Sequence, residues 1–185
     1  MNCADCFISG ENLSDEPNDL LISVEAFKST FPFTILLDRA MLIKQFGDGL
    51  VKYLGPAVLT SNLGANFFNY FSIESPKLNE YTFNSLMLNQ NMNFKLKMKS
   101  ITNENERVLT SKQFKDMELK GSMIYLEESD HLLFIGSPVI QHLEELTGRG
   151  LYISDIPIHD ATRDIILVGE QTKAQVSFYS LSSSF

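Results

Sequence analysis

A strand hairpin in the second half of the chain is the feature that most constrains its fold. Residues 117–128 (MELKGSMIYLEE) and 131–140 (HLLFIGSPVI) carry long strand patterns, and the short turn signal ESD joins them. Strands joined by so short a connection pair antiparallel. The chain is therefore predicted to build an antiparallel sheet around this hairpin.

Three further strands are predicted. Residues 32–39 and 41–49 are short apolar runs separated by a turn signal, which predicts a second hairpin. Residues 92–100 alternate apolar side chains with lysines, as in a strand with one buried face. Short helices are predicted over residues 23–31, 47–55, 66–73, 81–89 and 139–146. This order predicts an α+β domain of the PAS-like fold: a five-stranded antiparallel sheet, short helices on one face and a C-terminal helix.

Phenylalanines are concentrated in the predicted helical block. Aromatic and aliphatic residues recur there at helical spacing, which favours a packed apolar core. The alternative is a small-molecule-sensing PAS domain, with a ligand held between the sheet and the helices. The residues that would line such a pocket are Phe67, Phe71, Phe83 and Phe94.

The formal net charge of −8 argues against a nucleic-acid partner, because neutralising phosphates requires a basic surface. The most basic stretch, FKLKMKS, is predicted to be the solvated lysine face of a strand. No apolar run approaches the roughly 20 residues that a membrane-spanning helix needs. The acidic N-terminus lacks the pattern of a secretory signal, so a cytoplasmic location is expected. Cys3 and Cys6 have no second ligand pair at zinc-site spacing and are predicted to be functionally silent.

Residues 151–164 (LYISDIPIHDATRD) concentrate one histidine, three aspartates and one arginine, which could mark a metal or catalytic site or a helix start. A zincin-type site needs two histidines four residues apart, whereas Arg163 stands at that spacing from His159. A nucleophile held next to a base is also missing. Proline suits the first turn of a helix, and Ser154 or Asp155 can cap it. A helix start is favoured, and no catalytic, cofactor-binding or metal-binding residue is predicted.

This helix carries an apolar seam. Ile158, Ala161, Ile165 and Val168 follow one another in steps of three and four, as residues do where one helix packs on another. The pattern leaves two alternatives open. The seam either covers the sheet of its own domain or packs against a second chain.

Three motifs resemble a known family. The segments LKGSMIY, LFIGSP and GRGLYISDIPIHDATRD look like the PAS-like, or H-NOX-associated (HNOBA), domain of soluble guanylate cyclases, and the resemblance runs over residues 23–175. The forms QFGDG and TGRGLY look more like the α subunit than the β subunit. In this family the domain lies between a nitric-oxide-sensing H-NOX domain and a coiled coil, and a C-terminal cyclase domain converts GTP to cGMP.

The resemblance implies a dimerisation and signal-relay module without a bound cofactor. Its partner would be a β-type guanylate cyclase subunit, or a second copy in a homodimer of the isolated domain. It also implies that the seam faces the partner and that the chain, without H-NOX and cyclase domains, is inactive alone. The expected dimer interface comprises Phe31, Pro32, Phe33, Ile158, Ala161, Ile165 and Val168.

Four segments are therefore expected. Residues 1–22 form an acidic, weakly ordered leader, residues 23–157 the PAS-like domain, and residues 158–175 the signalling helix that starts a coiled coil. Residues 176–185 form a serine-rich tail that departs from the heptad pattern. That departure suggests a truncated product, a splice form or an incomplete gene model.

Overall fold

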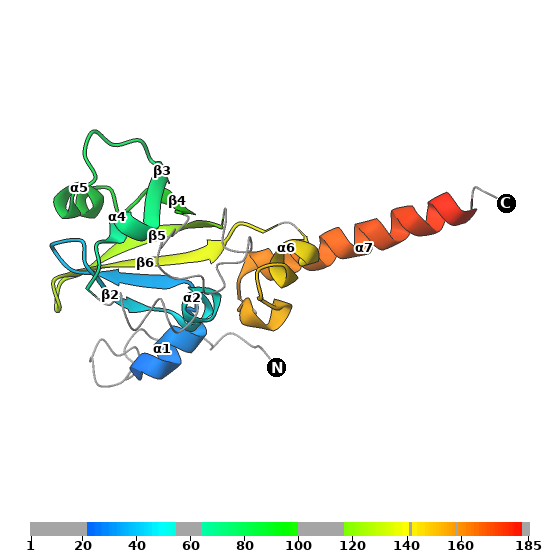
Figure 1. The fold of residues 1–185 in the computed structure, drawn as a ribbon, viewed down its shortest axis with the longest axis horizontal. Coiled ribbons are helices and arrows are strands. Elements are labelled where there is room, and N and C mark those ends of the chain that lie inside the picture. Colours follow the sequence, from blue (N-terminus) through cyan, green and yellow to red (C-terminus); the bar gives the residue numbers. More distant parts are fainter. Residues whose placement is uncertain (1–21, 55–63, 100–116, 141, 158, 183–185) are drawn as a thin grey trace, which may run out of the picture.

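The computed structural model describes residues 22–54, 64–99, 117–140, 142–157 and 159–182. Figure 1 shows an antiparallel sheet with helices around it and one long helix that projects from the domain. The strands are β1 (Thr34–Leu37), β2 (Ile43–Phe46), β3 (Phe71–Ser75), β4 (Asn93–Met98), β5 (Glu118–Leu126) and β6 (His131–Pro138). The helices are α1 (Val24–Thr30), α2 (Asp48–Leu54), α4 (Phe67–Tyr70), α5 (Phe83–Leu88), α6 (Leu143–Thr147), the 3-10 turn η3 (Ile153–Asp155) and α7 (Ala161–Ser182).

The sheet has the strand order β2-β1-β6-β5-β4-β3, and all neighbouring strands run antiparallel. The hairpin β5–β6 stays in register from Leu119 opposite Pro138 to Leu126 opposite His131. The hairpin β1–β2 turns at Asp38, whose Oδ1 accepts hydrogen bonds from the backbone N–H groups of Ala40 and Leu42, both at 2.9 Å. Both predicted hairpins and the α+β class are confirmed.

The sheet has six strands, so the prediction of five is wrong. The additional strand is β3, which pairs with β4 at the edge of the sheet. The helical spacing of Phe67, Tyr70 and Phe71 predicts one helix over residues 66–73. In the structure that helix ends at Tyr70, and Phe71 and Ile73 then alternate inward as strand residues.

The core lies on one face of the sheet, and paired residues show how it is assembled. Residues opposite each other in an antiparallel pair share a face. Ile35 lies opposite Phe134, Phe134 opposite Met123, and all three are buried. Helices α2, α4 and α5 add side chains to the same core, including Leu50, Tyr53, Phe67, Phe83 and Leu86.

The lysines of β4 lie on the other face of the sheet. The ammonium of Lys95 lies 3.3 Å from a carboxylate oxygen of Glu74 on β3 and 2.8 Å from one of Glu118 on β5. The hydrogen bonds that Lys95 donates to the carboxylates of Glu118 and Glu74 raise the pKa of Lys95 above its usual value. The predicted lysine face is thus tied to acidic residues of its own sheet. Cys3 and Cys6 lie outside the described residues.

Candidate interface at the base of helix α7

Helix α7 begins after Asp160. The Oδ1 atom of Asp160 accepts a hydrogen bond from the backbone N–H of Thr162 at 2.8 Å, which satisfies an orphan donor of the first turn. Its negative charge also suits the positive end of the helix. The sequence pattern predicts a helix start near Ile158 with Ser154 or Asp155 as cap, but both of these possible caps belong to η3. Ile158 lies outside the described residues.

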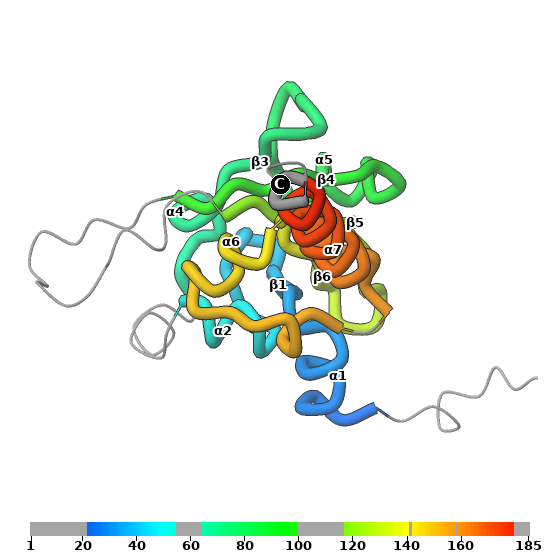
Figure 2. Tube along the Cα trace, turned by 90° about the vertical axis from the view of Figure 1, so that its right-hand side faces the viewer, coloured from blue at the N-terminus to red at the C-terminus, as the bar shows by residue number. Residues whose placement is uncertain are grey.

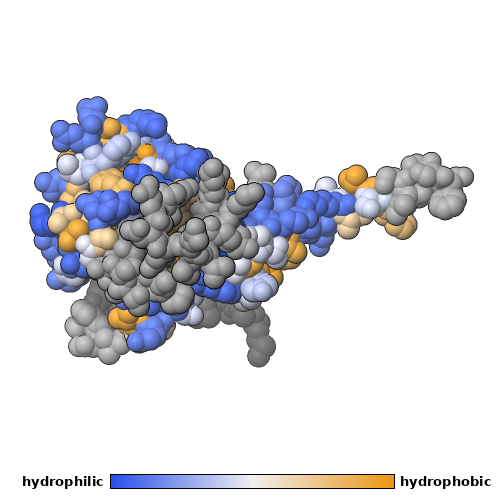
Figure 3. All heavy atoms as spheres, in the orientation of Figure 1, coloured by the Kyte–Doolittle hydropathy of each residue, from blue (hydrophilic) through white to orange (hydrophobic). Residues whose placement is uncertain are grey.

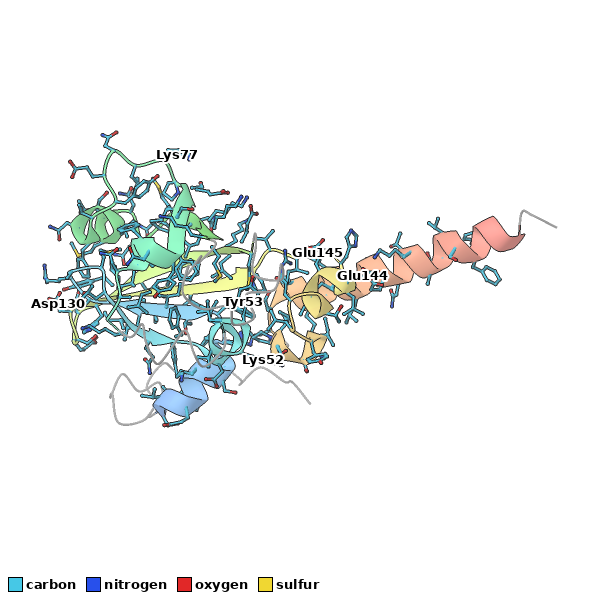
Figure 4. The ribbon with its side chains drawn as sticks, viewed as in Figure 1. Lys52, Tyr53, Lys77, Asp130, Glu144 and Glu145 are labelled. Carbon is cyan, nitrogen blue, oxygen red and sulfur yellow. The ribbon has the colours of Figure 1, made fainter. Side chains whose placement is uncertain are left out.

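Asp155 is engaged elsewhere, which explains why it does not cap α7. Its Oδ2 atom accepts hydrogen bonds from the backbone N–H of Tyr152 at 2.7 Å and from Nζ of Lys52 at 2.6 Å. The Lys52 ammonium also lies 4.8 Å from the centroid of the Tyr152 ring, a cation–π distance. Lys52 belongs to α2 (Figure 4), so this contact ties α2 to the segment that leads into α7.

His159 makes an aromatic contact. Its ring meets Phe31 edge-on, with the ring centroids 5.5 Å apart. Among the residues that the structure describes, no group of three or more His, Cys, Asp or Glu side chains is placed to hold a metal ion. The polar residues of 151–164 that have described contacts therefore act in capping, ion pairing and packing.

A groove of about 290 Å³ lies between the segment after α1, the hairpin β5–β6 and the start of α7. Its lining brings together three residues of the expected interface, Phe31, Pro32 and Ala161. Phe33 is placed differently, because its side chain is 1% exposed and belongs to the core of its own domain. The other lining residues are Lys120, Gly121, Ile135, Gly136, Ser137, Pro157, His159 and Asp160.

Helix α7 has one side turned to its own domain. Ile166 is fully buried and belongs to the same core as Leu146 and Leu151 from the segment before the helix. The seam residues Ile165 and Val168 are 57% and 59% exposed. Ile165 and Val168 therefore do not lie under the sheet of their own chain, which was one of the two alternatives that the sequence left open for the seam.

The seam continues along the outer part of α7. The helix runs to Ser182, beyond the expected end near Gln175. After Val168, steps of four, four and three lead to Thr172, Val176 and Tyr179. We call Ala161, Ile165, Val168, Thr172, Val176 and Tyr179 the α7 stripe; all six side chains are exposed. Figures 2 and 3 show the helix leaving the domain and apolar side chains on its far part.

The sheet adds a second apolar surface next to the groove. Leu36, Leu133 and Ile124 lie in a row across β1, β6 and β5, on the face opposite the core. Ile135 follows two residues after Leu133 on the same face and lines the groove. We call these four residues the sheet patch; Ile124 is exposed, Leu36 and Ile135 are half-buried, and Leu133 is buried. Sequence reasoning missed it, although Met123-Ile124 and Leu132-Leu133 place apolar residues on both faces of their strands.

Although α7 has 22 residues, no helix in the described ranges combines the length and apolar character needed to cross a bilayer. The outer part of α7 mixes its apolar residues with Ser, Gln, Thr and Lys. The outer part of α7, residues 174–182, has little intrinsic stability, because isolated helices shorter than about 12–15 residues are marginal in water. Its apolar stripe is thus a surface suited to packing against another helix.

Comparison with known proteins identifies the family. Residues 20–182 match the family described as "Heme NO binding associated". The rat protein "Guanylate cyclase soluble subunit alpha-2" is 45% identical over 165 residues, which cover 89% of this chain and 21% of that protein. The rat alpha-1 subunit is 42% identical over 158 residues, covering 85% of this chain and 22% of that protein. The rat beta-2 subunit is 33% identical over 160 residues, covering 86% of this chain and 22% of that protein.

These identities confirm the predicted resemblance to guanylate cyclase alpha subunits, because both alpha subunits exceed the beta-2 subunit in identity. The chain spans about a fifth of the length of the curated relatives it matches. The match covers the sheet, the base of α7 and the helix itself. The chain belongs to the Heme NO binding associated family.

Proposed function

We propose that this chain is the dimerisation and signal-relay domain of a soluble guanylate cyclase subunit of alpha type. The partner is the corresponding domain of a beta-type subunit, and a homodimer forms when the isolated domain has no such partner. The chain takes no part in the chemistry that converts GTP to cGMP in the parent protein. Its place of action is the cytoplasm, where nitric oxide signals reach the parent enzyme.

The α7 stripe is the observation that carries this proposal. The exposed apolar side chains of Ile165, Val168 and Val176 gain nothing from lying in one row in water, whereas a second helix would bury them. The groove and the sheet patch enlarge the surface beside the base of α7. That matters because a stable protein–protein interface buries roughly 1,200–2,000 Å² in total, more than one short helical seam provides.

The relatives support the choice of partner. They carry the names of alpha and beta subunits, and this chain is similar to both kinds over nearly the same length. Domains of one family that resemble each other can pair around an axis that is close to two-fold, which presents the same faces on both sides. Ile165 and Val168 would then meet the corresponding residues of the partner's helix.

Sedimentation velocity of the chain, alone and mixed with a beta-type domain of the same family, tests the proposal. We expect a heterodimer at low micromolar concentration. The substitution Val168→Asp should raise the dissociation constant of the dimer at least about ten-fold, because the interface would bury an unpaired carboxylate. Gln171→Glu is the matched control, since it adds the same charge to an exposed position of α7 outside the stripe.

Two results would contradict the proposal. The first is a chain that stays monomeric at tens of micromolar, both alone and in the mixture. The second is equal association of the Val168→Asp and Gln171→Glu variants, which would show that the stripe is not at the interface.

The packing of the phenylalanines favours relay over small-molecule sensing. Phe67, Phe71 and Phe94 are fully buried, and the rings of Phe67 and Phe71 stack with their centroids 5.3 Å apart. Side chains that fill the space between sheet and helices leave less room for a ligand. The visible absorption spectrum of the purified chain discriminates between these functions, since a haem or flavin band would support sensing.

A further inference from the structure

Helix α6 lacks a cap from its own N-terminus. Its N-cap residue is His142, whose side chain makes no capping hydrogen bond. The first backbone N–H groups of a helix have no partner inside the helix and must be satisfied from outside. A five-residue helix has few internal hydrogen bonds of its own, so its stability depends strongly on such a contact.

Helix α7 supplies the missing acceptor. The Oε1 atom of Glu170 accepts a hydrogen bond from the backbone N–H of Leu143 at 3.3 Å, across 27 residues of chain. A carboxylate is favoured at this place for two reasons. It accepts a hydrogen bond from an unpaired backbone N–H, and its negative charge is attracted to the positive N-terminal end of the helix dipole. Glu170 lies four residues after Ile166 and so belongs to the side of α7 that faces its own domain.

Lys173 completes the contact. Its Nζ donates hydrogen bonds to Glu144 of α6 at 2.8 Å and to Glu170 of α7 at 3.3 Å. Figure 4 shows Glu144 on α6 beside α7. The hydrogen bond from the ammonium of Lys173 lowers the pKa of Glu144 below its usual value. The ammonium thus bridges the two helices and holds Glu170 in place.

We infer that Glu170 and Lys173 form a clasp that caps α6 from α7, so that the two helices move as one unit. The side chains of residues 174–179 are all exposed, so the clasp lies at the outer end of the part of α7 that packs on the domain. On the other side, α6 follows β6 after a short connection. A displacement of β6 therefore reaches α7 through α6, and a displacement of α7 removes the cap of α6. The clasp itself is independent of dimerisation, whereas its use as a relay rests on the proposed function.

Amide hydrogen exchange in the full 185-residue chain tests the clasp. In the variant Glu170→Ala we expect the Leu143 amide to exchange about ten-fold faster. This increase in exchange rate corresponds to the loss of one hydrogen bond to a charged acceptor. Lys173→Ala should give a smaller increase, because Glu170 remains but is no longer held. Gln171→Ala is the matched control on the exposed side and should leave this amide unchanged.

A distance measurement reports the direction of α7. Spin labels at Glu127, on the β5–β6 turn, and Ala174, on α7, both replace exposed residues, with Cys3→Ser and Cys6→Ser in the background. The distance distribution should be narrow in the parent chain and broader with Glu170→Ala. Equal widths, or a Leu143 amide that exchanges freely already in the parent chain, would overturn the inference. Sedimentation decides the proposed function separately, because both measurements report on contacts within one chain.

Discussion

Ile166 anchors helix α7 to the domain, and its replacement by alanine tests this arrangement quantitatively. The side chain is fully buried, and the substitution removes three carbon atoms. Lost transfer free energy amounts to about 2.4 kcal/mol at about 0.8 kcal/mol per carbon. The cavity left behind adds to this, so we expect the free energy of unfolding to fall by about 2.5–4 kcal/mol.

The adjacent Ile165 provides a control with the same chemistry. Ile165→Ala removes the same three carbon atoms from a side chain that is 57% exposed. Because less than half of that side chain is buried in the monomer, we expect a loss of about 1 kcal/mol or less. The two substitutions differ by one position, so helix propensity affects both equally.

Urea unfolding followed by far-ultraviolet circular dichroism measures both losses by linear extrapolation. The chain concentration must be low enough for sedimentation to show monomer only, because a dimer would add its own contribution at Ile165. A smaller m value for Ile166→Ala would indicate that α7 leaves the domain before global unfolding. Equal losses for the two variants, or a larger loss for Ile165→Ala, would refute the assignment of the buried and exposed sides of α7.

Three further predictions concern the sheet and its connections. The Arg39 guanidinium lowers the pKa of Asp130 below its usual value of 3.8, so this ion pair contributes stability above the unfolded-state pKa and loses it as the pH falls through the folded-state pKa. Asp130→Asn should therefore flatten the dependence of stability on pH below about pH 4; an unchanged acid slope in denaturation profiles would contradict this. Gly121→Ala should lower the thermal midpoint and cost at least about 1–3 kcal/mol, because the new Cβ would lie 2.1 Å from the carbonyl oxygen of Ile135. Lys52→Ala should lower the free energy of unfolding by no more than about 1 kcal/mol, since the ion pair with Asp155 is partly exposed to solvent. A larger decrease in urea unfolding would contradict the view that this ion pair contributes only a surface interaction.

Patterns confined to single strands predicted much of the fold. The hairpin β5–β6 was predictable because its strands are long and its connection is short. Strand β3 was not, because a four-residue helix and a five-residue strand follow each other without a break in apolar character. Whether Phe71 continues a helix or starts a strand depends on the edge of β4 that is available for pairing, and this edge is not encoded within residues 66–75.

The candidate interface was predicted only in part. The seam at Ile165 and Val168 follows from periodicity, but Val176 and Tyr179 were missed because a strict heptad leads to Gln175 instead. A straight α-helix has 3.6 residues per turn, so its stripe drifts away from a 3.5-residue pattern. Phe33 was expected beside Phe31 and Pro32 at the interface, yet its side chain is buried in the core of its own domain. It lies in the turn before β1, where neither helix nor strand periodicity indicates which way a side chain points.

The sequence by itself determined what local periodicity can express: the strands of the two hairpins and β4, the places where apolar side chains recur, and the absence of a second histidine near His159. The tertiary structure decided which side of α7 its own domain covers, since Ile166 is buried and Ile165 is exposed. It also decided that Glu170 caps a helix 27 residues away. The physical reason is that burial and capping depend on neighbours brought together by the fold, whereas periodicity describes only which residues share a side.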